Sequence, residues 1–465
     1  MNKNQIVSIN KKSFITVCIV LCSLLIFAYV LTFLMVPGQY NNEGIYETVE
    51  GVSYNFWQFI SSPIRILWAA GKDSLNIVVI SIFIIVLGAG FNVMDKTGAI
   101  SSIINNLIIK YKSKKNTLMY IITLAFMLFG SVLGVFEESV ALLPIIVVLS
   151  LSLGWDTFTG LGMCLLAVGF GFSTAILNPF SVGLGSVALG ISSLDGIGIR
   201  ILIFIVMYIL LCIFLTIHVR KIEKDPTSSI TYDIDQEKRK NLSLMTTEVD
   251  KKAVKVYSIF FGIVILVMII FSVVPDLQGY SIPVIALVYL FGVFVCGNRL
   301  KYKFKEIWVM FKDGAIGILP AILLIMLAGA VKLILDESLT MDTIIYSVSS
   351  MLSGSSAFVT ILFIYAVILI MEFFIGSSSA KIALVLPIVA AIGENAGVSD
   401  RLTLLAFLFG DGYTNIVYPT NAVLLISLGL VGMSYGKWMK KTWLLQTVVL
   451  IITVAILYLC VVFGY

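Results

Sequence analysis

Residues 402–433 read LTLLAFLFGDGYTNIVYPTNAVLLISLGLVGM, an apolar stretch that polar residues, glycines and a proline interrupt between Gly410 and Asn421. A straight helix crosses the hydrocarbon core of a membrane with about 20 residues, so this stretch is too long for one span. The interruption in its middle predicts a broken helix. Non-helical backbone is tolerated at that depth only where protein or a water-filled cavity satisfies its polar groups. The stretch therefore predicts a membrane protein with a polar site inside it.

The composition of the whole chain agrees with a lipid environment. Of 465 residues, 59% are hydrophobic and 12% are charged, against about 45–50% and about 25% in soluble domains. The net charge of +5 does not indicate a nucleic-acid partner. The six cysteines lie in apolar blocks without a CxxC pattern, and His218 is the single histidine. We therefore expect no disulfide, metal site, catalytic triad or enzymatic activity.

The lengths of other apolar blocks predict a second broken helix and two hairpins. Residues 158–191 form another overlong block, which is interrupted at Asn178 and Pro179. Blocks 140–152 and 382–393 are too short to span a membrane, and each follows a longer block after a polar break. Such a pattern is typical of helical hairpins that enter the membrane and turn back.

The two halves of the chain repeat one order of elements: span, short lateral stretch, hairpin, broken helix, span. Pro144 corresponds to Pro387 and Asn178 to Asn421 at one constant offset. The first series begins outside the membrane and the second inside, so the copies are inverted, which is a transporter architecture. The predicted fold class is an all-α polytopic membrane protein with inverted repeats, each with a re-entrant helical hairpin and a broken transmembrane helix.

A polar segment separates these halves. Residues 1–219 form the N-terminal half, which contains a first spanning helix over Phe14–Val36 and repeat one. Residues 220–254 are rich in charged residues, Ser and Thr and poor in aromatics, which favours a mobile cytoplasmic linker over a regulatory element. Residues 255–465 form the C-terminal half, which is repeat two.

The distribution of basic residues predicts the orientation. With the N-terminus inside and each hairpin returning to its own side, the predicted cytoplasmic segments hold most of the 31 Lys and Arg residues, among them Lys3, Lys110 and Lys112. This bias follows the positive-inside rule and places the C-terminus on the extracytoplasmic side of the cell membrane. It does not distinguish a hairpin from two full crossings, because both return the chain to the same side.

Polar residues at the hairpin tips and the helix breaks are the candidate substrate-binding residues. Inverted hairpins and broken helices should meet near the midplane, where free helix-end N–H and C=O groups bind ions and polar groups. The first tip holds Glu137, Glu138 and Ser139, the second holds Ser377, Ser378, Ser379 and Lys381, and the breaks hold Asn178, Asp411, Thr414, Asn415, Thr420 and Asn421.

The charged residues among them leave alternative roles open. A tip glutamate binds a cationic group or a coupling proton, or it forms a buried ion pair, for instance with Lys381. Lys381 can instead bind a substrate carboxylate. Asp411 binds an amino group or a coupling cation, or it caps the broken helix. Glu372 and Lys332 lie in apolar blocks without a motif, and we expect structural or gating roles for them.

The motifs EES at 137–139, NPF at 178–180, GSSSAKIALVLP at 376–387 and FGDGYTNIVYPTN at 409–421 resemble those of the YfcC family, within the C4-dicarboxylate anaerobic carrier group of the ion transporter superfamily. The likeness implies a dimeric elevator carrier for organic anions or amino acids, and several members are regarded as basic amino-acid antiporters. The Ser-Asn-Thr signature of the sodium–dicarboxylate branch is absent in that form. The resemblance implies a role in the binding site for each candidate residue of the tips and breaks except Ser139.

These observations predict a secondary active transporter of amino acids, basic ones in particular, that works by arginine/ornithine-type antiport and alternating access across the plasma membrane. The alternative is a carboxylate or C4-dicarboxylate carrier with cation coupling. The coupling cation, H⁺ or Na⁺, stays open, and no other cofactor is expected. We expect the lipid bilayer and a second copy of the chain as partners. A membrane enzyme fits less well, because neither a His cluster nor a nucleotide loop is present. A channel fits less well, because inverted hairpins suit alternating access better.

Overall fold

A computed structural model gives the fold of the chain. It describes residues 11–40, 46–69, 72–100, 102–103, 106, 114–243, 250–274, 277, 280–349 and 356–465. Three lysines that the orientation prediction counts, Lys3, Lys110 and Lys112, lie outside the described residues.

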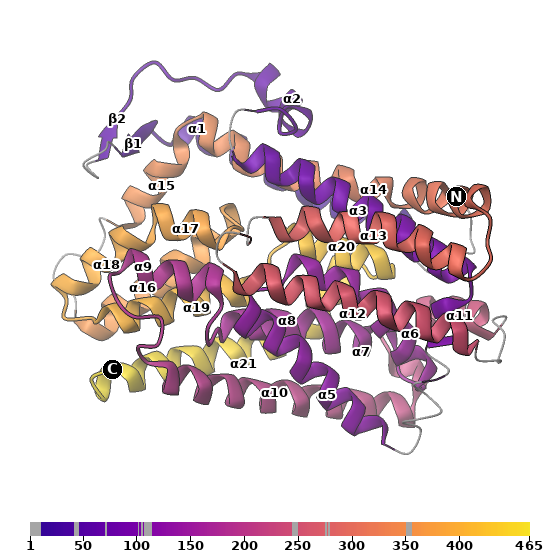
Figure 1. Cartoon of the computed structure of the whole chain (residues 1–465). Helices are drawn as coiled ribbons and strands as arrows, with labels where there is room; N and C mark the ends of the chain where they lie inside the picture. The colour runs from indigo at the N-terminus through magenta and orange to yellow at the C-terminus, as the bar shows by residue number, and fades with distance from the viewer. Residues whose placement is uncertain are drawn as a thin grey trace.

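The fold is a helix bundle with one short β-hairpin (Figure 1). Among the described residues, eight helices are long and apolar enough to cross a membrane, so the chain is a multi-pass membrane protein. Up to residue 224 the elements are α1 (Lys11–Leu34), β1 (Gly38–Tyr40), β2 (Tyr46–Thr48), α2 (Phe56–Arg65), α3 (Lys72–Lys96), α5 (Lys115–Leu128), η1 (Phe129–Leu133), η2 (Glu137–Ala141), α6 (Leu143–Ser152), α7 (Thr157–Leu161), η3 (Gly162–Leu166), α8 (Ala167–Ser173), η4 (Pro179–Gly183), α9 (Leu184–Ala188) and α10 (Ile197–Lys224).

The rest of the chain is helical in the described residues. Its elements are η5 (Pro226–Ser228), α11 (Tyr232–Ser243), α12 (Lys251–Val273), α13 (Ser281–Arg299), α14 (Phe304–Glu337), α15 (Thr340–Ser349), α16 (Ala357–Phe374), α17 (Ser378–Leu384), α18 (Leu386–Asn395), α19 (Asp400–Thr414), α20 (Ala422–Val431) and α21 (Tyr435–Val462).

Helix α10 shows how an outer helix divides its surface between protein and lipid. Ile205, Ile209 and Ile213 are about half exposed and lie four residues apart, on one face of the helix. Met207 and Leu211 are buried on another face against the bundle. An apolar stripe of this size left uncovered by the chain suits contact with lipid tails, because in water it would be an aggregation hazard.

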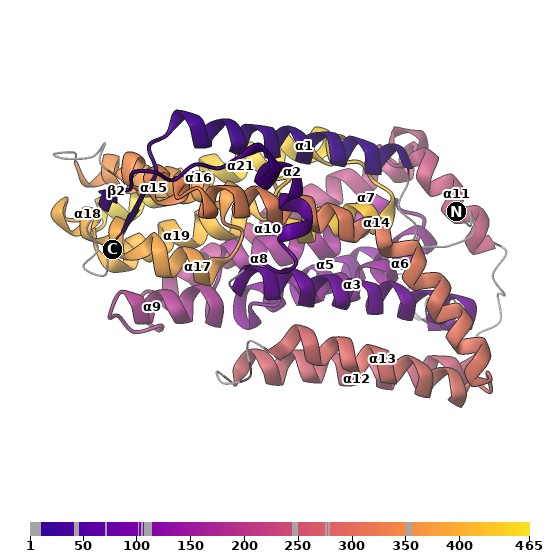
Figure 2. The same cartoon turned by 90° about the horizontal axis from the view of Figure 1, so that it is seen from above.

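The chain turns back after α5, as the short block 140–152 predicts. The Lys115 Nζ at the start of α5 donates to the Leu153 carbonyl at the end of α6, over 2.8 Å, so these two helix ends lie side by side. The turn lies between η1 and η2, where Gly134 has a φ of +68° that favours glycine. In both views α6 and α7 lie at the end of the bundle that also holds α11 (Figures 1 and 2).

A second turn of this kind follows α16 and leads through α17 into α18. In both views α18 and α9 lie with the C-terminus, at the end of the bundle opposite to α6, α7 and α11 (Figures 1 and 2). The two hairpins therefore enter the bundle from opposite ends.

The two overlong blocks are each broken, and an asparagine starts the second helical piece of each. Asn178 accepts hydrogen bonds from the N–H groups of Phe180 and Ser181, and Asn421 accepts one from Leu424 N–H. Asparagine is a favoured N-cap because its side-chain oxygen satisfies N–H groups that have no partner within the helix. These caps explain why helical structure restarts where it does after 174–178 and after 415–421.

The two broken helices cross at Gly412. A Cβ on Gly412 would lie 2.2 Å from Ser173 N and 2.3 Å from Ser173 Cα, which is closer than real contacts allow. Only glycine therefore lets α19 approach the end of α8 this closely. The crossing places the break after Ser173 beside the break after Thr414.

Part of the polar linker is folded and docked on the bundle, where the composition predicts a mobile tether. Helix α10 continues to Lys224, five residues beyond the predicted boundary at 219, and η5 and α11 follow it. Asp235 and Thr231 are buried, with exposed fractions of 3% and 0%. The linker residues 225–243 thus form packed structure against α6 and α7.

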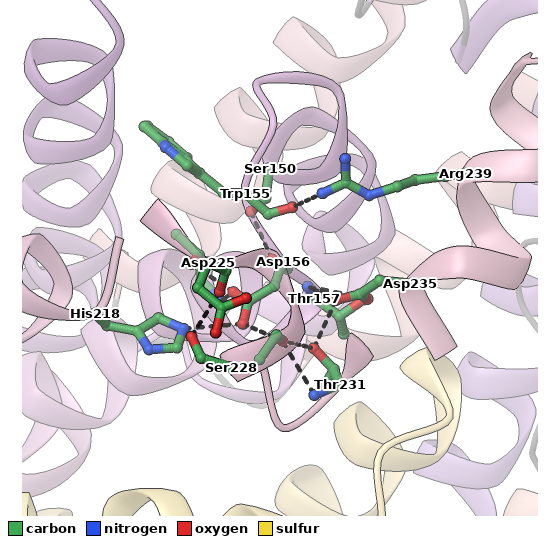
Figure 3. Close-up of polar contacts among 12 residues, drawn as sticks. Ser150, Trp155, Asp156, Thr157, His218, Asp225, Ser228, Thr231, Asp235 and Arg239 are labelled. Atoms are coloured by element: carbon green, nitrogen blue, oxygen red, sulfur yellow. Dashed lines mark hydrogen bonds and ion pairs between the residues drawn. The ribbon is translucent and has the colours of Figure 1, made fainter. Parts of the chain in front are cut away.

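Hydrogen bonds between far segments hold this part of the linker (Figure 3). Both carboxylate oxygens of Asp235 accept from Thr157 N–H, over 3.2 and 3.3 Å, at the start of α7. Asp156 accepts from His218 Nε2 over 2.9 Å and from Ser229 Oγ over 2.7 Å. Burial raises the pKa of Asp156, but the hydrogen bonds and charge of His218 and the hydroxyls lower it to about 2, so this carboxylate is ionised at neutral pH.

We expect Gly412→Ala to destabilise the protein by about 1–3 kcal/mol or more, because the new methyl group forces the broken helices apart. The measurement is the thermal unfolding midpoint of the purified protein in detergent. Gly198→Ala in α10 is the control, because a Cβ there meets no atom within 4 Å. Equal midpoints for the two variants would contradict the close crossing.

We expect Asp235→Ala to lower the free energy of unfolding by about 1–3 kcal/mol, because Thr157 N–H and the Thr231 hydroxyl lose a buried partner. Asp233→Ala, on the exposed side of the same helix, should change it little. Denaturation in detergent, monitored by circular dichroism, separates the two. If both variants match the unaltered protein, the linker does not dock as described.

Candidate functional site

Lys381 lies at the second hairpin tip and is completely buried. Its Nζ donates to the Ile375 carbonyl over 2.8 Å and forms ion pairs with Glu372 and, over 2.8 Å, with Asp411 Oδ1. Glu372 belongs to α16 and Asp411 to α19, so one ammonium group joins the end of α16, the hairpin tip and the second broken helix. One hydrogen bond and two ion pairs therefore surround this ammonium.

In the structure the ion-pair partners of Lys381 are Glu372 and Asp411, whereas the example that the sequence offered was a glutamate of the first tip. Glu372, for which we expected a structural or gating role outside the site, is 2% exposed and contacts Lys381 directly. Its position inside an apolar helix is the signal that could have placed it in the site, because ionisable residues at membrane depth are costly and usually functional.

The second break is a continuous polar chain around Asp411. Ser378 Oγ donates to Asp411 Oδ2 over 2.5 Å. Asn415 donates to the Asp411 carbonyl over 2.8 Å, and Asn421 donates to Asn415 Oδ1 over 2.5 Å. Thr420 Oγ1 is buried and has no hydrogen-bond partner among the described residues. The break therefore presents one hydroxyl that is available to a ligand.

Ser131 lies just before the first hairpin tip and connects that tip to the first break by hydrogen bonds. Its carbonyl accepts from the N–H groups of Ile176, Leu177 and Asn178, over 2.9 to 3.1 Å. Its Oγ donates to the Thr174 carbonyl over 2.8 Å. Sequence reasoning missed Ser131, because a serine in an apolar helix gives no pattern until its partner across the fold is known. In each half, the hairpin tip is thus bound to the break of the same half.

The acidic tip of the first hairpin faces the second half. Glu138 is buried at 5% exposure, and Glu137 is partly buried. Glu137 interacts electrostatically with Glu138 and with Asp411 of α19. The crossing of the two broken helices explains this proximity. Three carboxylates from both halves therefore lie in one region of the bundle, and Glu372 joins them through Lys381.

Several predicted site residues have local partners in the structure. Ser139 Oγ donates to the Phe136 carbonyl, and Thr414 Oγ1 to the Gly410 carbonyl, each within its own turn. Ser377 is the N-cap of α17, and its hydroxyl contacts that of exposed Ser379 over 3.2 Å. Asn178 is completely buried and donates to the Gly130 carbonyl. The hydrogen bonds of these side chains stabilise the tips and breaks.

Within the ranges that the structure describes, no group of three or more His, Cys, Asp and Glu side chains is placed to hold a metal ion. The carboxylates of Glu372 and Asp411 face an ammonium group between them.

Two bacterial proteins are similar to this chain in sequence. A protein of Escherichia coli (strain K12) named "Putative basic amino acid antiporter YfcC" is 27% identical over 375 residues, which cover 78% of this chain and 73% of that protein. A protein of Haemophilus influenzae described as "Uncharacterized protein" is 29% identical over 373 residues, which cover 79% and 72% of the two chains. The likeness to the YfcC family that the motifs indicate is thereby confirmed.

Two solved transporters align with the chain at lower similarity. The YdaH transporter of Alcanivorax borkumensis is 16% identical, with a TM-score of 0.42 over 97% of this chain and 98% of that one. MtrF of Neisseria gonorrhoeae is 17% identical, with a TM-score of 0.41 over 96% and 94%. Structural similarity of this size supports no argument about mechanism.

The sequence model of one transporter family matches nearly the whole chain. Its description is C4-dicarboxylate anaerobic carrier, and the match covers residues 14–462. The same residues contain both hairpins, both breaks and the buried charges described above. The chain therefore belongs to the C4-dicarboxylate anaerobic carrier family of membrane transporters.

Proposed function

We propose that this protein is a secondary active transporter that exchanges basic amino acids, in the manner of arginine/ornithine antiport, across the plasma membrane. The observation that supports this proposal is the charge of the site. Glu137, Glu138 and Asp411 lie together, and Glu372 adds a fourth carboxylate, against the ammonium groups of Lys381 and Lys332. An excess of buried negative charge favours a cationic ligand, because burying uncompensated charge costs several kcal/mol.

The saturation of Lys381 supports the same substrate class. Its Nζ is already hydrogen-bonded to the Ile375 carbonyl and ion-paired with Glu372 and Asp411. A substrate carboxylate would have to displace one of these partners and leave a buried carboxylate without its counter-charge. Breaking a buried ion pair in this way destabilises a protein by about 3–5 kcal/mol. A cationic side chain of the substrate instead adds a partner for Glu137 and Glu138.

The start of α20 offers a separate place for the α-carboxylate of an amino acid. The N-terminus of a helix attracts negative charge through its free N–H groups and the helix dipole. Thr420 Oγ1, just before the Asn421 cap, is buried without a partner among the described residues and can donate a hydrogen bond there. In the proposed pose, the substrate's cationic end lies at the acidic tip and its carboxylate at this break.

The arrangement of the hairpins suits alternating access. They enter from opposite ends of the bundle, and each is bound to its own broken helix, which supports the inverted repeats that the sequence predicts. We propose an elevator-type movement of the hairpins and breaks against α3, α13 and α14, in a homodimer, with the N-terminus cytoplasmic and the C-terminus outside.

A carboxylate or C4-dicarboxylate carrier with cation coupling is the second candidate, and the name of the family favours it. In that case Lys381 would exchange Glu372 or Asp411 for a substrate carboxylate, and a co-transported cation would neutralise the residue released.

We expect purified protein in liposomes loaded with unlabelled arginine to accumulate labelled arginine, ornithine or lysine by counterflow. Succinate should not compete, because Lys381 is already ion-paired with Glu372 and Asp411. Empty liposomes and liposomes loaded with succinate are the controls. Saturable succinate counterflow without any amino-acid counterflow would replace the first candidate by the second.

We expect Glu138→Gln to reduce counterflow of basic amino acids about tenfold or more, the size of a lost charge-assisted interaction. Glu394→Gln is the matched control, since Glu394 is exposed in α18. Initial rates over a range of substrate concentrations should show the loss mainly as weaker apparent affinity. If both variants transport alike, the acidic tip does not contact the substrate.

A further inference from the structure

The Glu372–Lys381–Asp411 cluster contains one more acid than base and lies inside protein. The three residues are 2%, 0% and 1% exposed. With all three ionised, the cluster has a net charge of −1 in a region of low dielectric constant. A buried net charge of this kind is unfavourable unless a further cation neutralises it. Binding one more positive charge would therefore make the cluster electrically neutral.

A proton suits this place better than a metal ion. The ammonium of Lys381 lies between the two carboxylates and contacts both, so it occupies the position that a shared metal ion would need. A metal ion there would also meet the repulsion of the ammonium. A proton needs only one carboxylate oxygen and no coordination shell.

Glu372 is the better proton acceptor of the two acids. Asp411 accepts hydrogen bonds from Ser378 as well as the ion pair with Lys381, and hydrogen bonds of this type favour the ionised carboxylate. Glu372 has the ion pair with Lys381. Losing the charge of Glu372 leaves Lys381 and Asp411 as a neutral, well-bonded pair.

Charged and titratable groups of other elements surround the cluster. Lys332 of α14 interacts electrostatically with Lys381, and Glu137 of the first tip interacts with Asp411. Tyr418 of the second break packs against Phe373, the neighbour of Glu372. A cation arriving at Glu137 therefore lies within electrostatic reach of the cluster.

We propose that Glu372 is the coupling-proton site of this transporter, and that a cationic substrate and a proton bind in exchange for each other. This proposal rests on the proposed transport of basic amino acids. When the substrate's positive charge enters beside Glu137 and Asp411, the O–H bond of Glu372 breaks, and the proton leaves to the water on the open side. When the substrate leaves, Glu372 takes up a proton, and the charge of the buried region is restored.

The first test needs no substrate. Infrared difference spectra of the purified protein between alkaline and neutral pH, a range over which exposed carboxylates stay ionised, report the carbonyl stretch of a buried carboxylic acid that takes up a proton. We expect such a band in the unaltered protein and in Glu394→Gln, and its loss in Glu372→Gln. A band of the same size in Glu372→Gln would overturn the assignment, whatever the protein transports.

The second test separates coupling from transport. In liposomes with an acidic interior and no internal amino acid, we expect the pH gradient to drive uptake of labelled arginine. Glu372→Gln should lower this gradient-driven uptake about tenfold or more, and by more than it lowers arginine–arginine exchange. Glu394→Gln should leave both rates near those of the unaltered protein. Exchange by the unaltered protein without any response to the gradient would overturn the proton proposal and leave the proposed function intact.

Two further results have a defined meaning. Absence of amino-acid exchange in the unaltered protein would refute the proposed function, and the infrared titration would still decide whether Glu372 binds a proton. If Glu372→Gln does not fold, Glu372→Asp keeps a titratable group at a changed distance from Lys381. A shift in the pH dependence of the infrared band supports the assignment, and an unchanged dependence contradicts it.

Discussion

The ammonium of Lys381 holds three elements together because a charge inside a membrane protein must meet its partners there. Its contacts with Glu372, Asp411 and the Ile375 carbonyl join α16, the tip before α17 and the broken helix α19. None of these groups can leave its partners without exposing a charge or a donor to a medium of low dielectric constant. The second hairpin is therefore bound to the second break by charge, whereas the first hairpin is bound to its break by the neutral hydrogen bonds of Ser131.

This difference between the two halves matters for function. Moving or opening a hairpin would change the contacts at its tip, and the contacts of Lys381 at the second tip depend on the ionisation of Glu372 and Asp411. Glu137 of the first tip interacts electrostatically with Asp411. In the proposed mechanism, the first half supplies an acidic surface for a ligand, and the second supplies a cluster whose charge adjusts to it.

The bundle exposes apolar side chains on its outside, and at some places hydrogen bonds join segments that are far apart in the sequence. The docked linker is the clearest example outside the membrane core. Its composition is that of a flexible tether, yet Asp235 accepts a hydrogen bond from the N–H of Thr157, and Asp156 is hydrogen-bonded to Ser229 and His218. Composition describes how a segment behaves alone and contains no information about a buried partner that lies some 70 residues away in the sequence.

The amino-acid sequence by itself determined the membrane setting, the positions of both hairpins and both breaks, and the family, because block length, interruption and motif are local properties of the chain. Only the tertiary structure decided which polar groups meet. It placed Glu372 beside Lys381, left Ser139 and Thr414 with partners in their own turns, and set Gly412 against Ser173. The physical reason is that pairing depends on distances between segments far apart in sequence, which arise only when helices pack.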